Sequence, residues 1–303
     1  MAHQPSRMGV WIEAFRLRTL PLALSVTLMG SLLAIADGTY HTIVIILSLV
    51  TTLFLQILSN LANDYGDALK GTDNEKRVGP QRTVQSGQIL PGEMKSAIII
   101  FALLSFLSGL GLLYAALGNH FLTAFLFLLL GVGAIAAAIK YTTGDHAYGY
   151  KGWGDFFVFL FFGWVAVMGT YYLNTLQFRW ALLLPASAMG FFSTGVLNLN
   201  NMRDTKNDKA AGKHTLASRM GYRKARYYHL SLLVLGWIFS LIYAVWQYRT
   251  PWNFLFLLVF PLFLRDAVKI MKTADETLLD PFLKRLALST LLFSLLYGMG
   301  MCL

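Results

Sequence analysis

Long blocks of apolar residues alternate with short polar stretches along the whole chain. A helix needs about 20 apolar residues to cross roughly 30 Å of hydrocarbon, and nine blocks come close to that length. Their centres lie near Val26, Leu49, Leu104, Leu129, Phe161, Ala188, Leu235, Leu258 and Leu292. The pattern predicts an all-α integral membrane protein, a multi-pass bundle of about nine transmembrane helices in which loops and short helices on one side cap a central cavity.

The distribution of Lys and Arg supports this topology, because cytoplasmic loops of membrane proteins are enriched in both. When successive loops are assigned to alternate sides, Arg179 and Arg249 are the only two of the 25 Lys and Arg residues that fall on the second side. The longer, more polar loops lie on the first side, where we expect the active site. We therefore predict a protein of the cytoplasmic (inner) membrane with its N-terminus and active face in the cytoplasm and its C-terminus outside.

The composition narrows the class of protein further. Apolar residues make up 56% of the chain and charged residues only 13%, which excludes an ordinary soluble domain. The net charge of +10 follows from the cytoplasmic bias and suits a surface of anionic lipid. We therefore expect the lipid bilayer as a partner, but neither a nucleic acid nor an obligatory protein partner.

Acid and amide side chains gather where two of the predicted spans end. Residues 60–73, NLANDYGDALKGTD, follow the second span, and residues 200–208, NMRDTKND after Asn200, follow the sixth. Side chains three or four apart share a face of a helix, and carboxylates are costly at a membrane boundary unless they bind something. The spans are four apart and share one orientation. We interpret 1–303 as a single domain with a weak internal repeat, whose two motifs face each other across the cavity.

Magnesium prefers oxygen ligands and commonly takes one or two carboxylates together with phosphate oxygens and water. Two acidic clusters that flank a gap suit a diphosphate bridged by Mg²⁺. The candidate metal ligands are Asn63, Asp64, Asp67 and Asp73 in the first motif and Asn200, Asp204 and Asp208 in the second. Asp67 and Asp204 are also the acids that we expect to be essential for catalysis.

Basic residues lie within and after both motifs and supply the other half of such a site. The candidate diphosphate-binding residues are Lys70, Arg77, Arg82, Lys206 and Lys213. Interleaved acids and bases could instead neutralise each other on a solvated face. The recurrence of the pattern after two similarly placed spans favours a shared site.

A third polar loop, KYTTGDHAYGYKGWGD, begins at Lys140. Its glycines separate aromatic residues and would let rings and backbone approach a flat ligand. We predict Lys140 and Tyr141 as catalytic residues and Tyr148, Tyr150 and Asp155 as acceptor-binding residues. The alternative is that the aromatic residues are anchors at the membrane interface, where Tyr and Trp are enriched.

The pattern NxxxDxxxxxD at Asn63, Asp67 and Asp73, paired with NxxxDxxxD at Asn200, Asp204 and Asp208, resembles the two aspartate-rich motifs of the UbiA superfamily of intramembrane prenyltransferases. The segments SNLANDYGDALKGTD, RTVQSG, YGYKGWGD and VLNLNNMRD are most similar to the branch that acts on 1,4-dihydroxy-2-naphthoate in menaquinone biosynthesis. The resemblance implies a Mg²⁺-dependent transfer of a polyprenyl group from polyprenyl diphosphate to this acceptor, with loss of carbon dioxide, to give demethylmenaquinone. Two extra residues before Asp73 leave open whether Asp64 or Asp73 completes the first metal set.

Other functions remain open at this point. Another aromatic acceptor, such as 4-hydroxybenzoate, would require the same motifs. A CDP-alcohol phosphotransferase also uses intramembrane aspartates, but its DG step and following Ala-Arg pair are missing after Asp67 and Asp73. An ion-coupled transporter would carry charges near mid-membrane, whereas all the acids here except Asp37 fall near the predicted cytoplasmic side.

Overall fold

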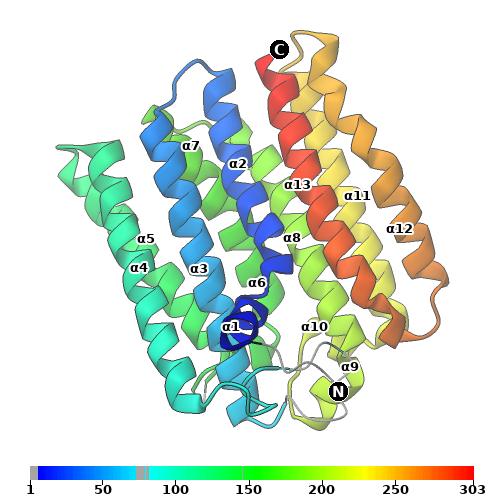
Figure 1. The fold of residues 1–303 in the computed structure, drawn as a ribbon. Helices are drawn as coiled ribbons and strands as arrows, with labels where there is room; N and C mark the ends of the chain where they lie inside the picture. The colour runs from blue at the N-terminus through cyan, green and yellow to red at the C-terminus, as the bar shows by residue number, and fades with distance from the viewer. Residues whose placement is uncertain (1–5, 73–78, 80–81, 145) are drawn as a thin grey trace.

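The structure, a computed structural model, describes residues 6–72, 79, 82–144 and 146–303. The regular elements of these residues are all helices (Figure 1). The α-helices are α1 (Arg7–Phe15), α2 (Leu20–Ala36), α3 (Thr42–Leu69), α4 (Pro91–Leu117), α5 (Phe121–Lys140), α6 (Gly154–Phe159), α7 (Gly169–Thr175), α8 (Leu183–Arg203), α9 (Thr205–Ala210), α10 (Leu216–Met220), α11 (Tyr222–Trp246), α12 (Phe260–Lys272) and α13 (Asp280–Cys302). Short 3-10 segments are η1 (Leu17–Thr19), η2 (Tyr148–Lys151), η4 (Trp180–Leu182), η5 (Pro251–Val259) and η6 (Glu276–Leu279), and η3 (Leu160–Met168) is a π-helix.

Among the described residues, eight helical stretches are long and apolar enough to cross a membrane. They are Arg7–Ala36, Thr42–Leu69, Pro91–Leu117, Phe121–Lys140, Gly154–Thr175, Trp180–Arg203, Tyr222–Trp246 and Glu276–Cys302. The predicted block around Leu258 is built in two parts, because η5 ends at Val259 and α12 begins at Phe260. Pro261 lies at this junction, and its backbone nitrogen has no hydrogen to donate. This two-part helix stands beside α11 and α13 in Figure 1. The predicted multi-pass helical bundle is confirmed.

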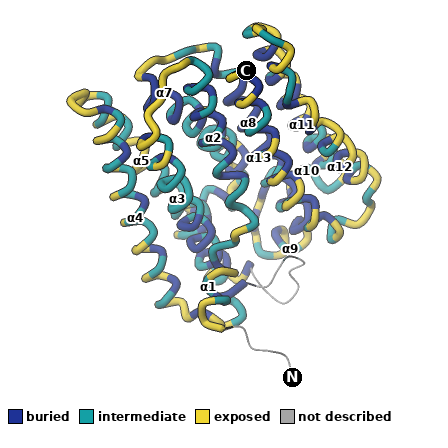
Figure 2. Tube along the Cα trace, turned by 45° about the horizontal axis from the view of Figure 1, so that its top comes forward, coloured by how far each residue is buried: buried dark blue, intermediate teal, exposed yellow. Residues whose placement is uncertain are grey.

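The long helices run side by side, and α1 and the C-terminal end of α13 lie at opposite ends of the bundle (Figure 1). Helices α3 and α8 both finish at the end that also carries α1, α9 and α10, here called the motif end. Burial is greatest on faces that look into the bundle, and exposure is greatest on the outer helices (Figure 2). Helix α5, at the edge, has no buried residue. Such a helix is suited to lipid on its outer side.

A large apolar cluster holds α8, α11, η5, α12 and α13 together. Its centre contains aromatic rings packed mostly edge to face, among them Phe192, Trp237, Phe256, Phe263 and Phe293. Edge-to-face pairs contribute about 0.5–1.5 kcal/mol each beyond the area that they bury. This half of the bundle is therefore a rigid wall against which the motif of α8 is fixed.

Some polar side chains inside the membrane-spanning segments form hydrogen bonds between helices. The hydroxyl groups of Thr27 on α2 and Thr52 on α3 are 2.8 Å apart, and Ser294 on α13 donates a hydrogen bond of 2.6 Å to the carbonyl of Ser25 on α2. Hydrogen bonds of this kind link helices where the hydrophobic effect cannot. Helix α2 is thereby tied to both α3 and α13.

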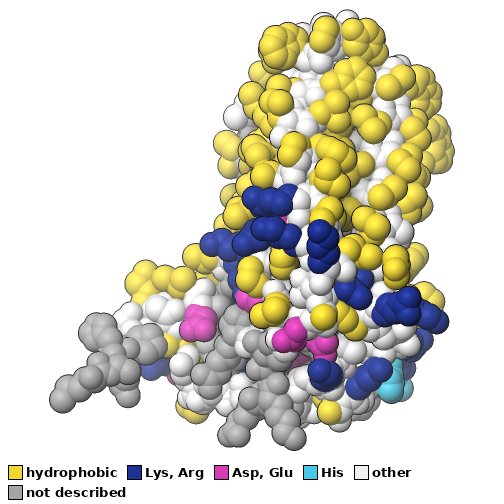
Figure 3. All heavy atoms as spheres, turned by 90° about the vertical axis from the view of Figure 1, so that its right-hand side faces the viewer, with side chains coloured by type: hydrophobic (Ala, Val, Ile, Leu, Met, Phe, Trp, Pro, Cys, Tyr) yellow, Lys and Arg dark blue, Asp and Glu magenta, His cyan; other side chains and the backbone are white. Residues whose placement is uncertain are grey.

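The outer surface separates into two zones. On the side shown in Figure 3, apolar side chains cover the part away from the motif end, and Lys and Arg gather in a band toward it, above most of the acids. Such a band suits the boundary between hydrocarbon and lipid headgroups. The protein is an integral membrane protein by its helices and by this surface.

Candidate active site

A cavity of about 380 Å³ opens between the helices toward the motif end. Mid-helix residues such as Val26, Ala134, Phe161 and Val165 form its apolar part. The polar lining comes from helix ends and loops, and comprises Arg16, Arg18, Asn63, Asp67, Thr72, Arg82, Asn200, Asp204, Asn207, Asp208, Lys213 and Lys284, among others. The cavity suits an elongated ligand with an apolar tail and a charged head.

The first motif presents Asp67, not Asp64, to this cavity. Tyr150 donates a hydrogen bond of 2.7 Å from its hydroxyl to Oδ1 of Asp67, which is buried and belongs to the lining. Asp64 lies on an adjoining face of α3, where its Oδ2 accepts hydrogen bonds from the hydroxyl (2.7 Å) and backbone N–H (3.3 Å) of Thr83. Asp64 therefore anchors the loop that follows the first motif. Asp73 and Arg77 lie outside the described residues.

The second motif is organised by a buried arginine. The guanidinium of Arg203 donates to both carboxylate oxygens of Asp204, at 2.8 and 2.7 Å, and to Oδ1 of Asn200 at 2.9 Å. It also donates to Asp280 at the start of α13, which in turn pairs with Arg18. The Arg203 side chain is fully buried. Its two hydrogen bonds to Asp204 fix both the distance between the guanidinium and the carboxylate and the orientation of the two planar groups. The end of α8 is thus locked to α13.

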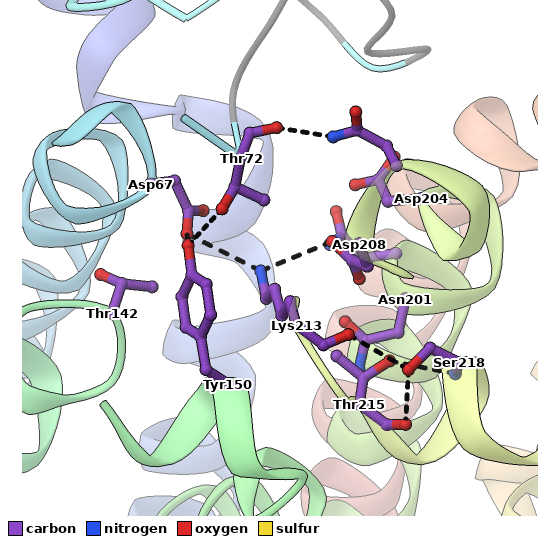
Figure 4. Close-up of polar contacts among 12 residues, drawn as sticks. Asp67, Thr72, Thr142, Tyr150, Asn201, Asp204, Asp208, Lys213, Thr215 and Ser218 are labelled. Carbon is purple, nitrogen blue, oxygen red and sulfur yellow. Dashed lines mark hydrogen bonds and ion pairs between the residues drawn. The ribbon is translucent and has the colours of Figure 1, made fainter. Parts of the chain in front are cut away.

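Lys213 joins the two motifs (Figure 4). Its Nζ lies 3.8 Å from Oδ1 of Asp67 and 3.9 Å from Oδ1 of Asp208. Burial lowers the pKa of Lys213, but the combined fields of Asp67 and Asp208 outweigh burial and raise it above the ordinary value. The side chain therefore stays positively charged between two carboxylates that are 141 residues apart in the sequence.

Three loops meet around Tyr150. Its hydroxyl oxygen lies 2.5 Å from the hydroxyl oxygen of Thr72. The backbone carbonyl of Thr72 accepts a hydrogen bond of 2.6 Å from the side-chain amide of Asn207. The carbonyl of Tyr150 accepts a hydrogen bond of 2.9 Å from the backbone of His214. Residues after α3, α5 and α8 thereby form one cap.

The loop after α5 approaches α3 through a glycine. A Cβ at Gly66 would lie 2.6–2.8 Å from the side chain and backbone of Thr142. This close approach lets the Thr142 hydroxyl form hydrogen bonds of 3.0 Å to the carbonyl of Ala62 and 3.3 Å to Oδ1 of Asn63. Gly66 is required for the loop to dock beside Asn63.

The structure separates the predicted basic residues into two groups. Arg82 and Lys213 line the cavity. Lys70 lies with its Nζ 4.1 Å from the ring centroid of Tyr150, outside the lining. Lys206 is 85% exposed and pairs with Glu276 at 2.9 Å, and Lys140 is also exposed and outside the lining.

The predicted aromatic residues are likewise divided. Tyr141 and Tyr148 line the cavity, with ring centroids 5.3 Å apart, and the Tyr148 ring packs in a tilted arrangement, with centroids 4.4 Å apart, against Phe157, a further lining residue. Tyr150 belongs to the cap. Asp155 lies away from the lining, where it accepts a hydrogen bond of 3.1 Å from Tyr228.

Arg203, Asp280 and Thr83 organise the site although sequence reasoning did not single them out. Arg203 stands directly before Asp204, and its position inside the second motif was a signal that it belongs to the site. Asp280 and Thr83 offered no such signal, because their roles depend on how distant segments pack.

The donor atoms fit a metal ion that also binds phosphate. The lining brings together carboxylate and amide oxygens from Asn63, Asp67, Asn200, Asp204 and Asp208. Over the part of the chain that the structure describes, no group of three or more His, Cys, Asp or Glu side chains is close enough to enclose an ion by itself. Oxygen donors that leave positions for a phosphorylated ligand are the usual environment of Mg²⁺.

An amphipathic cavity inside a bundle of membrane helices, with carboxylate and amide oxygens at its polar end, is the arrangement expected of an intramembrane enzyme that binds a lipid with a charged head group. The model of the UbiA prenyltransferase family matches residues 23–298. The chain belongs to this family. The resemblance found in the motifs is thereby confirmed, and the transporter and phosphotransferase alternatives are set aside.

Relatives match over nearly the whole length. The 1,4-dihydroxy-2-naphthoate octaprenyltransferase of Escherichia coli is 44% identical, over 98% of this chain and 96% of the relative. The protein of the same name from Haemophilus influenzae is 41% identical, over 97% and 96%. That of Mycobacterium tuberculosis is 36% identical over 94% of each chain.

Solved structures share the fold. A UbiA homologue from Aeropyrum pernix aligns with a TM-score of 0.66 at 14% identity, over 94% of this chain and 97% of that one. A UbiA homologue from Archaeoglobus fulgidus, bound to DMAPP and Mg²⁺, aligns with a TM-score of 0.57 at 18% identity, over 94% and 98%.

Proposed function

We propose that this protein transfers a polyprenyl group from polyprenyl diphosphate to 1,4-dihydroxy-2-naphthoate, with release of carbon dioxide, in menaquinone biosynthesis. The observation that carries the proposal is the convergence of Asp67 and Asp208, from two distant motifs, on one amphipathic cavity. The names of three relatives at 36–44% identity support the choice of acceptor.

Mg²⁺ is the proposed cofactor, and Asn63, Asp67, Asn200, Asp204 and Asp208 would hold it. When bound, it supplies positive charge to a departing diphosphate. The Archaeoglobus homologue bound to DMAPP and Mg²⁺ supports this assignment.

The head group of the prenyl donor would occupy the polar mouth, with its tail along Val26, Phe161 and Val165. Arg82 and Lys213 are the lining cations nearest the first motif. Positive groups that are already in place where charge develops are the largest single source of catalysis in many enzymes. Arg82 and Lys213 would therefore stabilise the diphosphate as it leaves.

The reaction balances as a substitution on the aromatic ring. The bond between the allylic carbon and the bridging oxygen breaks, and its electron pair leaves with diphosphate. A ring carbon of the acceptor bonds to the allylic carbon, and the carboxylate departs as carbon dioxide, returning its electron pair to the ring. The product is the reduced, diol form of demethylmenaquinone.

Tyr141, Tyr148 and Phe157 form an aromatic wall of the cavity. Aromatic faces attract a cation by roughly 0.5–2 kcal/mol each, and rings also pack well against a flat acceptor. The wall would shield the allylic cation from water and orient the naphthalene ring. Burial raises the pKa of Tyr141 above its ordinary value, so its hydroxyl stays neutral and does not compete as a nucleophile.

The distribution of basic residues supports the orientation. The motif end, with the N-terminus, would face the cytoplasm, and the C-terminus would lie outside the inner membrane. Water-soluble 1,4-dihydroxy-2-naphthoate would then enter from the cytoplasm while the prenyl donor stays in the bilayer.

The proposal is tested by incubating the purified protein with Mg²⁺, a set of prenyl diphosphates and a set of aromatic acceptors, followed by mass spectrometry. We expect a product from 1,4-dihydroxy-2-naphthoate that has gained the prenyl group and lost carbon dioxide. A product that forms only from 4-hydroxybenzoate and keeps its carboxyl group would contradict the choice of acceptor. The Asp67→Asn variant is the matched control for background reaction.

A further inference from the structure

The ammonium group of Lys213 occupies the gap between the two acidic motifs (Figure 4). Its distances of 3.8 Å to Asp67 and 3.9 Å to Asp208 are nearly equal. Both exceed the 2.7–3.2 Å range of a hydrogen bond, so the charge is shared between the carboxylates and bound tightly to neither. The Lys213 side chain is 8% exposed.

The backbone around Lys213 is fixed more firmly than its side chain. The backbone N–H of Lys213 donates a hydrogen bond of 2.8 Å to the carbonyl of Asp208. The carbonyl of Lys213 accepts a hydrogen bond of 3.3 Å from the hydroxyl of Ser218. The side-chain oxygen of Thr215 caps α10 by accepting a hydrogen bond of 3.1 Å from the backbone N–H of Ser218. A flexible four-carbon side chain on this fixed base can move its charge without moving the loop.

We propose that Lys213 is a built-in cation that takes the place of a divalent ion between Asp67 and Asp208 in the ligand-free protein and moves to the diphosphate when metal and substrate enter. The inference rests on the proposed function, because it assumes a metal-bound diphosphate as the ligand. It assigns Lys213 a positioning role beyond contact with the substrate.

Two consequences of opposite sign follow. Without diphosphate, the Lys213 charge opposes entry of a second cation between the same carboxylates, so it lowers the affinity for a divalent ion alone. With diphosphate present, the same charge pairs with phosphate oxygens and increases affinity. The protein would then take up metal chiefly together with its substrate.

The test measures Mn²⁺ binding to the purified, substrate-free protein by electron paramagnetic resonance. We expect Lys213→Gln to bind Mn²⁺ at least tenfold more tightly than wild type, which corresponds to about 1.4 kcal/mol. Lys213→Arg, which retains the charge, should bind as wild type does. Lys209→Gln removes an exposed charge from the same loop and should also leave binding unchanged. Equal or weaker Mn²⁺ binding by Lys213→Gln would overturn the proposal.

A second arm uses inorganic diphosphate with saturating Mg²⁺, measured by calorimetry. Lys213→Gln should bind it at least tenfold more weakly, and equal or tighter binding would contradict the movement of Lys213 to the phosphates. Lys213→Met, which matches the length of the apolar stem, replaces Lys213→Gln in both arms if the latter fails to fold. Neither arm contains an aromatic acceptor, so a wrong choice of acceptor leaves both results interpretable.

Discussion

The two acidic motifs share a sequence pattern, but the structure supports them in different ways. Asp67 in the first motif is held by Tyr150 and Lys213, which both belong to other loops. Asp204 in the second motif is held by Arg203, the residue before it in the chain, and Arg203 is anchored in turn to Asp280. The first motif depends on assembly of the cap, whereas the second is fixed by the packed core of the bundle.

This difference indicates a division of labour. A carboxylate held by side chains from separate segments depends on how those segments pack. A carboxylate held by a buried bidentate arginine is already in place. We interpret the second motif as the more firmly anchored half of the site.

The largest effect is expected within the first motif itself. Asp67→Asn removes a charge from the cavity and should reduce transfer roughly a thousandfold, since a preorganised charge of this kind contributes at that scale. Asp64→Asn should reduce turnover less than about tenfold and lower stability by about 1 kcal/mol, the usual net value of a hydrogen bond such as that to Thr83. Turnover and thermal melting of both variants provide the measurement. Equal loss of turnover in the two would remove the distinction between them.

The support of the second motif should dominate stability. Arg203→Ala leaves Asp204 and Asp280 without their partner and should lower the free energy of unfolding by about 3–5 kcal/mol, as for other broken buried pairs. Arg203→Lys should recover little, because lysine cannot form a bidentate pair. Reversible unfolding in mixed micelles measures this loss. Arg265→Ala removes a half-exposed partner of Asp266 and should change stability by less than about 1 kcal/mol.

The docking of the cap on the first motif can be broken with one methyl group. Gly66→Ala forces a Cβ into Thr142 and should lower stability by about 1–3 kcal/mol, the usual cost of overpacking. Transfer should fall as well, because Asp67 lies one residue away. Gly111→Ala is the control, since nothing lies within 4 Å of its added Cβ. There alanine should be neutral or stabilise α4 by up to about 1 kcal/mol. Identical melting curves for the two variants would argue against the close approach.

Tyr150→Phe tests how far Asp67 depends on the cap. Loss of the hydrogen bond should cost about 1 kcal/mol and reduce turnover roughly fivefold through misplacement of Asp67. Tyr222→Phe removes a comparable hydrogen bond, of 2.9 Å to the carbonyl of Thr273, away from the cavity. It should show a similar change in melting temperature with unchanged turnover. If both variants have wild-type turnover, the carboxylate does not need Tyr150.

The smallest effect is expected for Lys206, which was predicted to bind diphosphate because it lies within the second motif. It is exposed and pairs with Glu276 at the surface. Lys206→Ala should change stability by less than about 1 kcal/mol and turnover less than twofold. A tenfold rise in the KM for prenyl diphosphate would instead place Lys206 in the site.

The architecture and half of the site were predictable because their signals are local. Apolar block length and the position of Lys and Arg define the spans, and helix periodicity places Asn63 and Asp67, or Asn200 and Asp204, on related faces. Each of these signals can be read from one continuous stretch of sequence. The family resemblance then added the reaction, which no periodicity contains.

The remaining site residues depend on packing between distant segments. Arg203 meets Asp280 only because α8 and α13 pack together. Lys213 meets Asp67 only because the loop after α9 reaches the end of α3. Lys213 lines the cavity from the loop after α9, whereas Lys206 on α9 is exposed and pairs with Glu276. Lys140 is exposed although Ala137 on the same helix lines the cavity, and apolar periodicity does not fix the rotation of a side chain at the last position of a helix.

The most direct test of the shared site is a double-mutant cycle on the dissociation constant of a non-hydrolysable prenyl diphosphate analogue in the presence of Mg²⁺. Asp67→Asn and Asp208→Asn are measured singly and together. If both carboxylates hold one metal-bound head group, the two losses are non-additive, with a coupling energy of about 1 kcal/mol or more. Losses that add to within about 0.5 kcal/mol would contradict the convergence of the two motifs on a single ligand.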